Sequence, residues 1–374
     1  MKMKIHYTYF FRSVCLLLFV FSASSAMAQV RYYQVSGKVL QGDIKAPMQS
    51  ASVQAQHTTI GTATDTEGNF TIYLPEGGYE LAFSFTGYQT ESRRVSSSDG
   101  NQQTLIVELK PREKELEAVA VVASNEVKDG WEKYGSFFKD AFIGKTANSA
   151  HCHLLNPSVL KFYFSKKRNR LKVLSEEPLQ IENKALGYTI RYTLDSFVHE
   201  YQSGISQYTG FPMFEELRSD DPAQVKAWKE ARSKAYRGSI LHFMRSVYQQ
   251  RLTEEGFEIQ FLITVNNRDT AIRLKNYYGA MNYKKDDSTQ TVSVRPNQLQ
   301  VAVIYIDEPP APEYRAINPE APEDFQFSVL NFQPGDQLFI EKNGFYFEQP
   351  DITIRDYWTW DKLADMLPYD YVVE

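Results

Sequence analysis

The chain has 374 residues, with 41 basic and 46 acidic side chains and a net charge of −5. This balance excludes a surface adapted as a whole to nucleic acid, and it gives no sign of a polybasic membrane-surface patch. Tyr and Phe number 24 each, and residues of this type favour strands, so the composition indicates a β-rich protein.

The first 28 residues have the three parts of a secretory signal peptide. Lys2 and Lys4 precede an apolar run from Val14 to Phe21, and Ala26-Met27-Ala28 offers a small-residue cleavage site. Because the run is too short to anchor the chain in a bilayer, we predict that residues 1–28 are removed and that no transmembrane anchor remains. Residues 1–28 hold three basic and no acidic residues, so the mature chain carries a net charge of about −8.

Residues 29–110 show short runs with period-2 alternation, separated by turn signals. The alternation predicts an antiparallel β-sandwich. Asp65-Thr66-Glu67-Gly68 predicts a tight turn, because Asp can bond its own backbone two residues on and Gly can adopt a positive φ. The alternating positions are Val35, Gly37, Val39, Ala51, Val53, Ala55, Phe70, Ile72, Leu74, Tyr79, Leu81, Phe83, Phe85, Leu105, Val107 and Leu109.

These motifs, in this order, resemble the carboxypeptidase regulatory-like domain. The matching pieces are Val35-Ser36-Gly37-Lys38-Val39, Pro47, Ala51-Ser52-Val53, Gly61 to Phe70 and Gly87-Tyr88. The resemblance implies a transthyretin-like sandwich of seven strands, common in exported proteins of Bacteroidetes-type bacteria and without catalytic residues of its own. It also implies a location in the periplasm or at the surface of a Gram-negative bacterium.

Residues 111–124 are interpreted as a linker. A charged stretch, Pro111 to Glu115, is followed by the small apolar stretch Leu116 to Val122. In nutrient-uptake receptors of the same bacteria a similar stretch follows the same sandwich and precedes a large outer-membrane barrel. That resemblance implies an accessory role in uptake, whereas an ordinary strand or linker fits the composition equally. The 250 residues after Ser124 are too few for such a barrel.

Residues 125–374 are predicted to form one α+β domain with a mainly antiparallel sheet. Several pieces of it resemble the uncharacterised second domain that follows the sandwich in many exported proteins of these bacteria. They are Phe142-Ile143-Gly144, Cys152, Asn156-Pro157, Leu186-Gly187-Tyr188, Tyr208-Thr209-Gly210, Ala235 to Ser239 and His242-Phe243. Pro309 to Pro322 is expected to be a surface loop. Helices are predicted at 127–143, 222–236, 240–253 and 356–366. Strands are predicted at 158–164, 171–175, 186–194, 196–202, 257–265, 290–295, 299–306, 325–332, 337–341 and 344–349.

No catalytic residue, metal site or cofactor is predicted. His151 and His153 flank Cys152, but on a strand the two histidines share one face and the thiol points to the other. Zinc needs three or four ligands, and no nearby side chain completes the set. Cys15 leaves with the signal, so Cys152 remains alone without a disulfide partner. His199 starts a metalloprotease-like pattern that lacks its second histidine.

The helical hairpin at 222–253 is the candidate ligand site. A cation beside a helix start can receive an anion together with the backbone N–H groups. A helical hairpin packed on a sheet would show the same pattern, and that alternative stays open. The six candidate residues are Trp228, Arg232, Tyr236, Arg237, His242 and Arg245.

The function predicted from the sequence is that of a non-catalytic exported envelope protein, a binding or scaffold module for a protein or glycan partner. A hydrolase acting on a peptide or cell-wall substrate is the first alternative, because paired carboxylates such as Glu215-Glu216 or a Cys152–His pair can be assembled in space. An accessory to an outer-membrane uptake system is the second. The acidic charge balance predicts no nucleic-acid partner.

Overall fold

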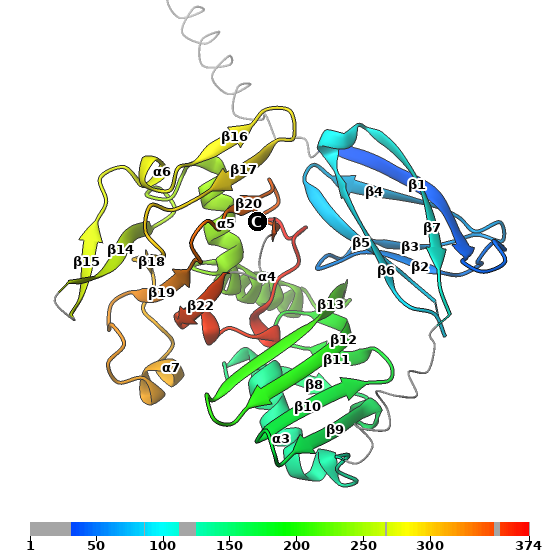
Figure 1. The fold of residues 1–374 in the computed structure, drawn as a ribbon, viewed down its shortest axis with the longest axis horizontal. Helices are drawn as coiled ribbons and strands as arrows, with labels where there is room; N and C mark the ends of the chain where they lie inside the picture. The colour runs from blue at the N-terminus through cyan, green and yellow to red at the C-terminus, as the bar shows by residue number, and fades with distance from the viewer. Residues whose placement is uncertain (1–30, 86, 112–124, 266–267, 348–351, 374) are drawn as a thin grey trace, which may run out of the picture. The chain divides into compact units, whose positions relative to one another are not determined.

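The computed structural model describes residues 31–85, 87–111, 125–265, 268–347 and 352–373 (Figure 1). The predicted signal peptide and residues 112–124 of the predicted linker lie outside these residues. Residues Tyr33–Glu374 form one compact unit. Within the described part of the chain, no helix is long and apolar enough to cross a membrane.

Seven strands in two sheets make up the first domain, which confirms the predicted sandwich. The sheets have the strand orders β4-β1-β7 and β3-β2-β5-β6 (Figure 1). The prediction of antiparallel pairing throughout is wrong for β1 and β7, which are parallel. Side chains alternate in both kinds of sheet, so the pattern cannot distinguish them. The strands are β1 (Tyr32–Gln41), β2 (Ser52–Ala55), β3 (Gly61–Ala63), β4 (Asn69–Pro75), β5 (Gly78–Ser84), β6 (Glu91–Ser96) and β7 (Gln102–Leu109).

The alternating apolar positions fill the space between the two sheets. Among them, Phe85 is exposed and Leu105 only half-buried, whereas the other large side chains are buried. The predicted turn is confirmed, since the Asp65 carboxylate accepts hydrogen bonds from the backbone N–H groups of Glu67 and Asn69 at 2.9 and 2.8 Å. Gly68 has φ +76°, and a Cβ there would lie 2.7 Å from the Val39 carbonyl oxygen. The turn therefore requires glycine.

A six-stranded antiparallel sheet with helix α3 against it forms the next layer. The sheet has the order β8-β11-β12-β10-β9, and β13 pairs with the other edge of β12. Phe138 and Phe142 of α3 are buried in its core. The elements are α3 (Gly130–Phe142), β8 (Cys152–Leu154), β9 (Leu160–Ser165), β10 (Arg170–Ser175), β11 (Leu179–Asn183), β12 (Tyr188–Glu200) and β13 (Ile205–Glu216).

The two strands predicted at 186–194 and 196–202 are one long strand, β12, with an irregularity at Asp195. Leu194 pairs with Gly210 and Ser196 with Thr209, so Asp195 is an extra residue. Burial follows even positions up to Leu194 and odd positions from Phe197 onwards. The bulge thus keeps the apolar side chains on the inner face, and it looks like a strand break in the sequence.

Strand β13 was not predicted, because Gly210 and Pro212 interrupt its pattern. Proline is tolerated there, since β13 pairs with β12 and lies at the edge of the sheet. The Pro212 carbonyl instead accepts a hydrogen bond from the His57 N–H at 2.8 Å. Strand β13 therefore contacts the β2–β3 loop of the sandwich.

Two predicted helices and two further antiparallel sheets complete the second domain. The sheets have the orders β15-β14-β18-β19-β22 and β16-β17-β20-β21, so the domain holds three sheets where one was expected. Helix α4 spans Pro222–Tyr236 as predicted. The other elements are α5 (Ile240–Gln249), β14 (Phe257–Val265), β15 (Arg268–Arg273), α6 (Tyr277–Ala280), β16 (Lys284–Asp286), β17 (Thr291–Val294), β18 (Gln300–Tyr305), α7 (Pro312–Ile317), β19 (Gln326–Asn331), β20 (Leu338–Ile340), β21 (Tyr346–Phe347) and β22 (Thr353–Asp356).

The helix predicted at 356–366 is wrong. After β22 the chain makes two short 3₁₀ turns, Tyr357–Thr359 and Leu363–Asp365. Trp358 packs in the core of the five-stranded sheet and Leu363 in the core of the six-stranded sheet. The Trp358 indole also donates to the Gly238 carbonyl at 2.8 Å. Because these side chains serve two cores, tertiary packing overrides their helical spacing.

Candidate functional site

Helices α4 and α5 start where the sequence predicts, and α4 also ends there, whereas α5 ends at Gln249 and not at residue 253. Asp221 caps α4 by accepting from the Ala223 N–H at 2.9 Å, with Pro222 in the first turn. Gly238 breaks the helix with φ +73°. Ser239 caps α5, and its hydroxyl accepts from the His242 N–H at 3.2 Å. The hairpin therefore brings the six candidate residues into one region of the second domain.

Arg232 joins α4 to the turn before β12. Its Nε and Nη2 groups donate to the carbonyls of Leu186 and Gly187 at 2.7 and 3.0 Å. Its Nη1 pairs with Glu216 at 3.0 Å, and the guanidinium lies 4.0 Å from the centre of the Tyr188 ring. The side chain is 11% exposed. Arg232 therefore stabilises the contact between α4 and the turn before β12.

Trp228 has a comparable role one turn earlier. Its indole N–H donates to the Lys184 carbonyl at 2.9 Å, and the ring is buried. Gly187 packs directly beneath it: a Cβ there would lie 2.4 Å from the ring. Trp228 therefore fixes the position of α4 on the six-stranded sheet.

Within the hairpin, the Tyr236 ring lies against both His242 and Arg245. The His242 Nδ1 accepts from the Gly238 N–H at 3.2 Å, so the proton lies on Nε2, 3.2 Å from the Glu255 carboxylate. Burial lowers the pKa of His242 below its usual value, although Glu255 opposes this. Arg245 donates to the carbonyls of Asn343 and Tyr369 at 2.9 and 3.0 Å.

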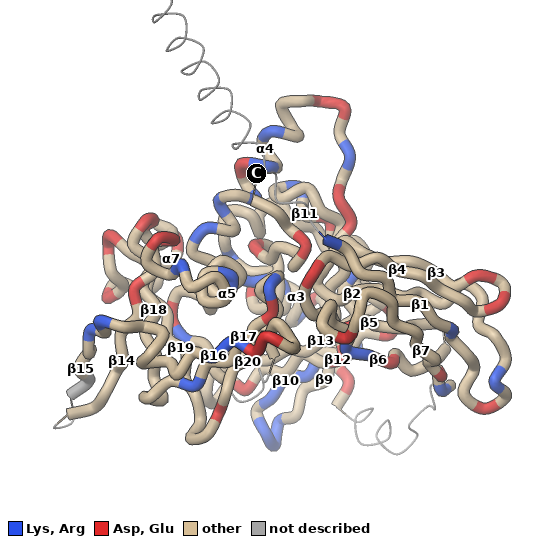
Figure 2. The backbone as a smooth tube through the Cα atoms, turned by 90° about the horizontal axis from the view of Figure 1, so that it is seen from above, with Lys and Arg blue, Asp and Glu red and all other residues tan. Residues whose placement is uncertain are grey.

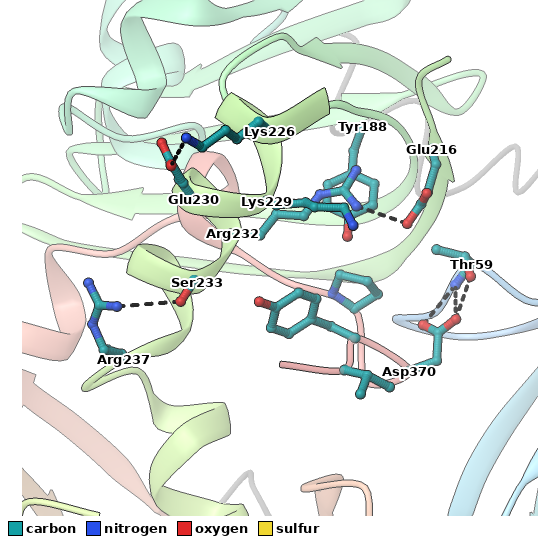
Figure 3. Close-up of a pocket in the computed structure, with 13 residues that line it drawn as sticks. Thr59, Tyr188, Glu216, Lys226, Lys229, Glu230, Arg232, Ser233, Arg237 and Asp370 are labelled. Carbon is teal, nitrogen blue, oxygen red and sulfur yellow. Dashed lines mark hydrogen bonds and ion pairs between the residues drawn. The ribbon is translucent and has the colours of Figure 1, made fainter. Parts of the chain in front are cut away.

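A cleft of about 680 Å³ opens beside α4, and we call it the α4 cleft (Figure 3). Of the six predicted residues, Arg232 and Arg237 line it, whereas Trp228, Tyr236, His242 and Arg245 are not among its lining residues. Figure 3 labels Lys229 and Arg232, which both come from α4 and line this cleft. The lining residues are Thr59, Tyr188, Glu216, Lys226, Lys229, Glu230, Arg232, Ser233, Arg237, Pro368, Asp370, Tyr371 and Val372.

Charges of both signs line the α4 cleft. Lys226 and Glu230 form an exposed ion pair at 3.7 Å, and Arg237 pairs with Glu308. The Asp370 carboxylate accepts from the Thr59 N–H at 3.0 Å and from its hydroxyl. Burial raises the pKa of Asp370. The cleft is therefore polar, and cationic chiefly on the α4 side.

Sequence reasoning missed part of this lining. Lys226 and Lys229 precede Arg232 at intervals of three residues, a spacing that places them on neighbouring parts of one helix face and could have extended the candidate set. Thr59, Asp370 and Tyr371 come from distant segments and have no local signal. Only the packed fold brings them to α4.

A second cleft, of about 450 Å³, lies on the other side of α4 and contains a pair of carboxyl groups that the sequence did not suggest. Asp365 accepts hydrogen bonds from the Thr146 hydroxyl and the Asn148 amide at 2.8 and 2.9 Å. Burial raises the pKa of Asp361 well above its usual range, and the neighbouring Asp365 raises it further. Trp360 lines the same cleft, and its buried indole N–H has no hydrogen-bond partner among the described residues.

Cys152 is half-buried in β8, opposite Asn183 of β11. Burial, with a smaller effect of Asp365, raises the pKa of its thiol to about 12. The thiol is therefore protonated at neutral pH. Among the residues that the structure describes, no group of three or more His, Cys, Asp and Glu side chains could hold a metal ion.

Residues 35–121 match the model of the CarboxypepD_reg-like domain family. The sandwich is a carboxypeptidase regulatory-like domain. The chain is also 26% identical over 117 residues to TonB-dependent receptor P3 of Formosa agariphila. That alignment covers 31% of this chain and 11% of the receptor, so the chain spans a small part of this relative.

Similar chains among solved structures include two DUF3823 family proteins. That of Bacteroides ovatus has a TM-score of 0.19 at 9% identity and covers 50% of this chain and 83% of its own. That of Parabacteroides merdae has a TM-score of 0.18 at 11% identity and covers 53% and 85%. A protein of unknown function from Bacteroides fragilis has a TM-score of 0.19 at 9% identity and covers 83% and 94%. TM-scores this low indicate nothing about the function of this chain.

Proposed function

We propose that the protein is a non-catalytic exported envelope protein whose second domain binds carboxylate groups of a partner in the α4 cleft. The partner is an acidic glycan or an acidic protein segment, since both present carboxylates along an extended chain. The carboxypeptidase regulatory-like sandwich supports an exported setting. The likeness to a receptor concerns a small part of that receptor, so an accessory role in outer-membrane uptake stays a prediction.

The cationic wall of the α4 cleft carries this proposal. Lys229 is exposed at the cleft, and Arg232, one turn further along α4, is held rigidly by two carbonyls and Glu216. Tyr371 and Pro368 on the opposite segment supply apolar surface. A volume of about 680 Å³ lies in the range of ordinary ligand sites, and its polar lining suits a hydrated, charged ligand.

The test compares binding of two acidic probes, oligogalacturonate and polyglutamate, with neutral maltooligosaccharides by calorimetry. Lys229→Glu reverses the charge of an exposed side chain, so we expect about tenfold weaker binding of the acidic probe without a lower melting temperature. Lys139→Glu, an exposed reversal on α3, is the matched control. Equal affinity of both variants, or no binding of either acidic probe by the unaltered protein, would refute the proposal.

A second candidate function is hydrolysis of a cell-wall glycan or peptide, favoured by one observation. Asp361 and Asp365 line the second cleft, and both carboxyl groups have raised pKa values. A carboxyl kept protonated beside an ionised one is the arrangement that general acid–base catalysis uses. Release of soluble fragments from purified cell walls that is lost in Asp361→Asn, with the fold intact, would support it. No release by the unaltered protein would exclude it.

A further inference from the structure

The hairpin formed by β9 and β10 concentrates positive charge in an acidic chain. Residues 157–175 contain six basic and no acidic side chains, whereas the whole sequence carries a net charge of −5. In Figure 2 basic positions gather beside the labels β9 and β10. The negative net charge of the whole chain therefore does not reflect this basic segment. The expectation that the chain has no polybasic patch is wrong for residues 157–175. The six are Lys161, Lys166, Lys167, Arg168, Arg170 and Lys172.

The register of the hairpin directs these cations to solvent. Lys172 pairs with Tyr163, and the residues on either side of Lys172 point inward and are buried. Arg170 forms an ion pair with Glu200 at 3.3 Å. The turn residues Lys166, Lys167 and Arg168 are exposed, and within the described residues their side chains have no ion-pair partner. Three cations thus project together from one turn.

Exposed apolar side chains lie beside this basic turn. The β12–β13 turn adjoins it, since the Tyr201 N–H donates to the Asn169 carbonyl at 3.1 Å. Tyr201 is 38% and Ile205 54% exposed. The Tyr201 ring is held in place by Phe137 and Phe164, with centroid distances of 6.1 and 5.9 Å. Ile205 pairs with Glu200, which pairs with Arg170, so Tyr201 and Ile205 lie at the end of the sheet that carries the basic turn. Exposed apolar side chains at this end distinguish it from an ordinary solvated lysine turn.

We propose that these two turns, 165–170 and 200–205, dock reversibly on a bilayer surface that contains lipid headgroups of net negative charge. Lysine and arginine are attracted to anionic headgroups, and tyrosine and isoleucine fit the boundary between headgroups and acyl chains. An anionic polymer would also be attracted by the cations, but it would offer no apolar surface for Ile205 to contact. The exposed apolar pair therefore favours the lipid surface, and the inference does not depend on the α4 cleft.

The test is co-sedimentation of the mature chain with vesicles of phosphatidylethanolamine and phosphatidylglycerol, compared with vesicles of phosphatidylcholine. Each surface cation contributes about fivefold to the partition coefficient. We expect the triple variant Lys166→Gln/Lys167→Gln/Arg168→Gln to bind the anionic vesicles about 100-fold more weakly. The matched control is Lys226→Gln/Lys229→Gln/Lys234→Gln, which removes the same charge from α4. This control should bind vesicles normally, which separates the inference from the proposed function.

Two further measurements make the proposal specific. Ile205→Ser should weaken vesicle binding by roughly threefold to tenfold, because an exposed apolar side chain is lost without any change in charge. Binding should also fall steeply between about 0.05 M and about 0.5 M salt. Equal loss in both triple variants, equal binding to phosphatidylcholine, or binding to oligogalacturonate but not to vesicles would overturn the proposal.

Discussion

Two arginines of the α4–α5 hairpin, Arg232 and Arg245, and the three cations of the β9–β10 turn lie in opposite surroundings. Arg232 and Arg245 donate to backbone carbonyls inside the fold, and Arg232 is 11% exposed. The side chains of Lys166, Lys167 and Arg168 are exposed to solvent. The comparison teaches that clustering of arginines in the sequence does not by itself indicate a binding surface.

Backbone geometry explains why the first group is enclosed. The carbonyls of Leu186 and Gly187 lie in the turn before β12, where Gly187 has φ +70°, and the Gly187 carbonyl also accepts a hydrogen bond from the Leu217 N–H at 2.9 Å. A guanidinium with five N–H donors can satisfy several such groups at once. In the β9–β10 turn the hydrogen bonds are made by backbone groups, with the Asn169 N–H donating to the Lys166 carbonyl at 3.4 Å and the Tyr201 N–H to the Asn169 carbonyl at 3.1 Å. Its side chains remain available.

The largest expected effect comes from Arg232→Ala. The substitution removes the Arg232 donor from the Leu186 carbonyl and one of two donors from the Gly187 carbonyl, and it removes the contact with the Tyr188 ring. We expect the free energy of unfolding to fall by about 3 kcal/mol. Urea denaturation measures it. Arg168→Ala, the exposed counterpart, should change the value by less than about 0.5 kcal/mol. Similar losses in both variants would break the comparison between enclosed and exposed cations.

A buried and an exposed histidine allow the same comparison for the pH dependence of stability. His242 is buried with a lowered pKa, whereas His153 is exposed. A lowered histidine pKa means that the unfolded chain takes the proton first, so stability is present above the unfolded pKa of about 6.5 and is lost as the pH falls. Between about pH 7 and pH 5 the unaltered protein should lose on the order of 1 kcal/mol more than His242→Gln.

The control is His153→Gln, which removes an exposed histidine and is measured at the same pH values. Chemical denaturation at each pH gives both curves. His57 is also enclosed, and burial lowers its pKa to about 4, but it is present in every variant and cancels in the difference. Parallel curves for the unaltered protein and His242→Gln would show that the buried ring does not resist protonation.

The parts of the fold that depend on local pattern could be predicted, and those that depend on distant packing could not. The sandwich core, the Asp65 turn and both ends of α4 follow from spacing and capping residues. The prediction of a helix at 356–366 was wrong because Trp358 and Leu363 pack in two different hydrophobic cores. The α4 cleft was found in part, through Arg232 and Arg237. Its other walls come from Thr59 and the C-terminal segment, which no local pattern connects to α4.

The smallest expected effect concerns Cys152, whose reactivity tests whether its thiol is buried. Burial raises the pKa of its thiol to about 12, so almost no thiolate is present near neutral pH. The thiol of the folded protein should therefore react with a labelling reagent much more slowly than the thiol of the urea-unfolded chain. Cys152→Ala replaces one small apolar group by another and should cost about 1 kcal/mol or less. Rapid labelling of the native protein would instead indicate an accessible thiolate, and it would restore a nucleophilic role for Cys152 in the hydrolase alternative.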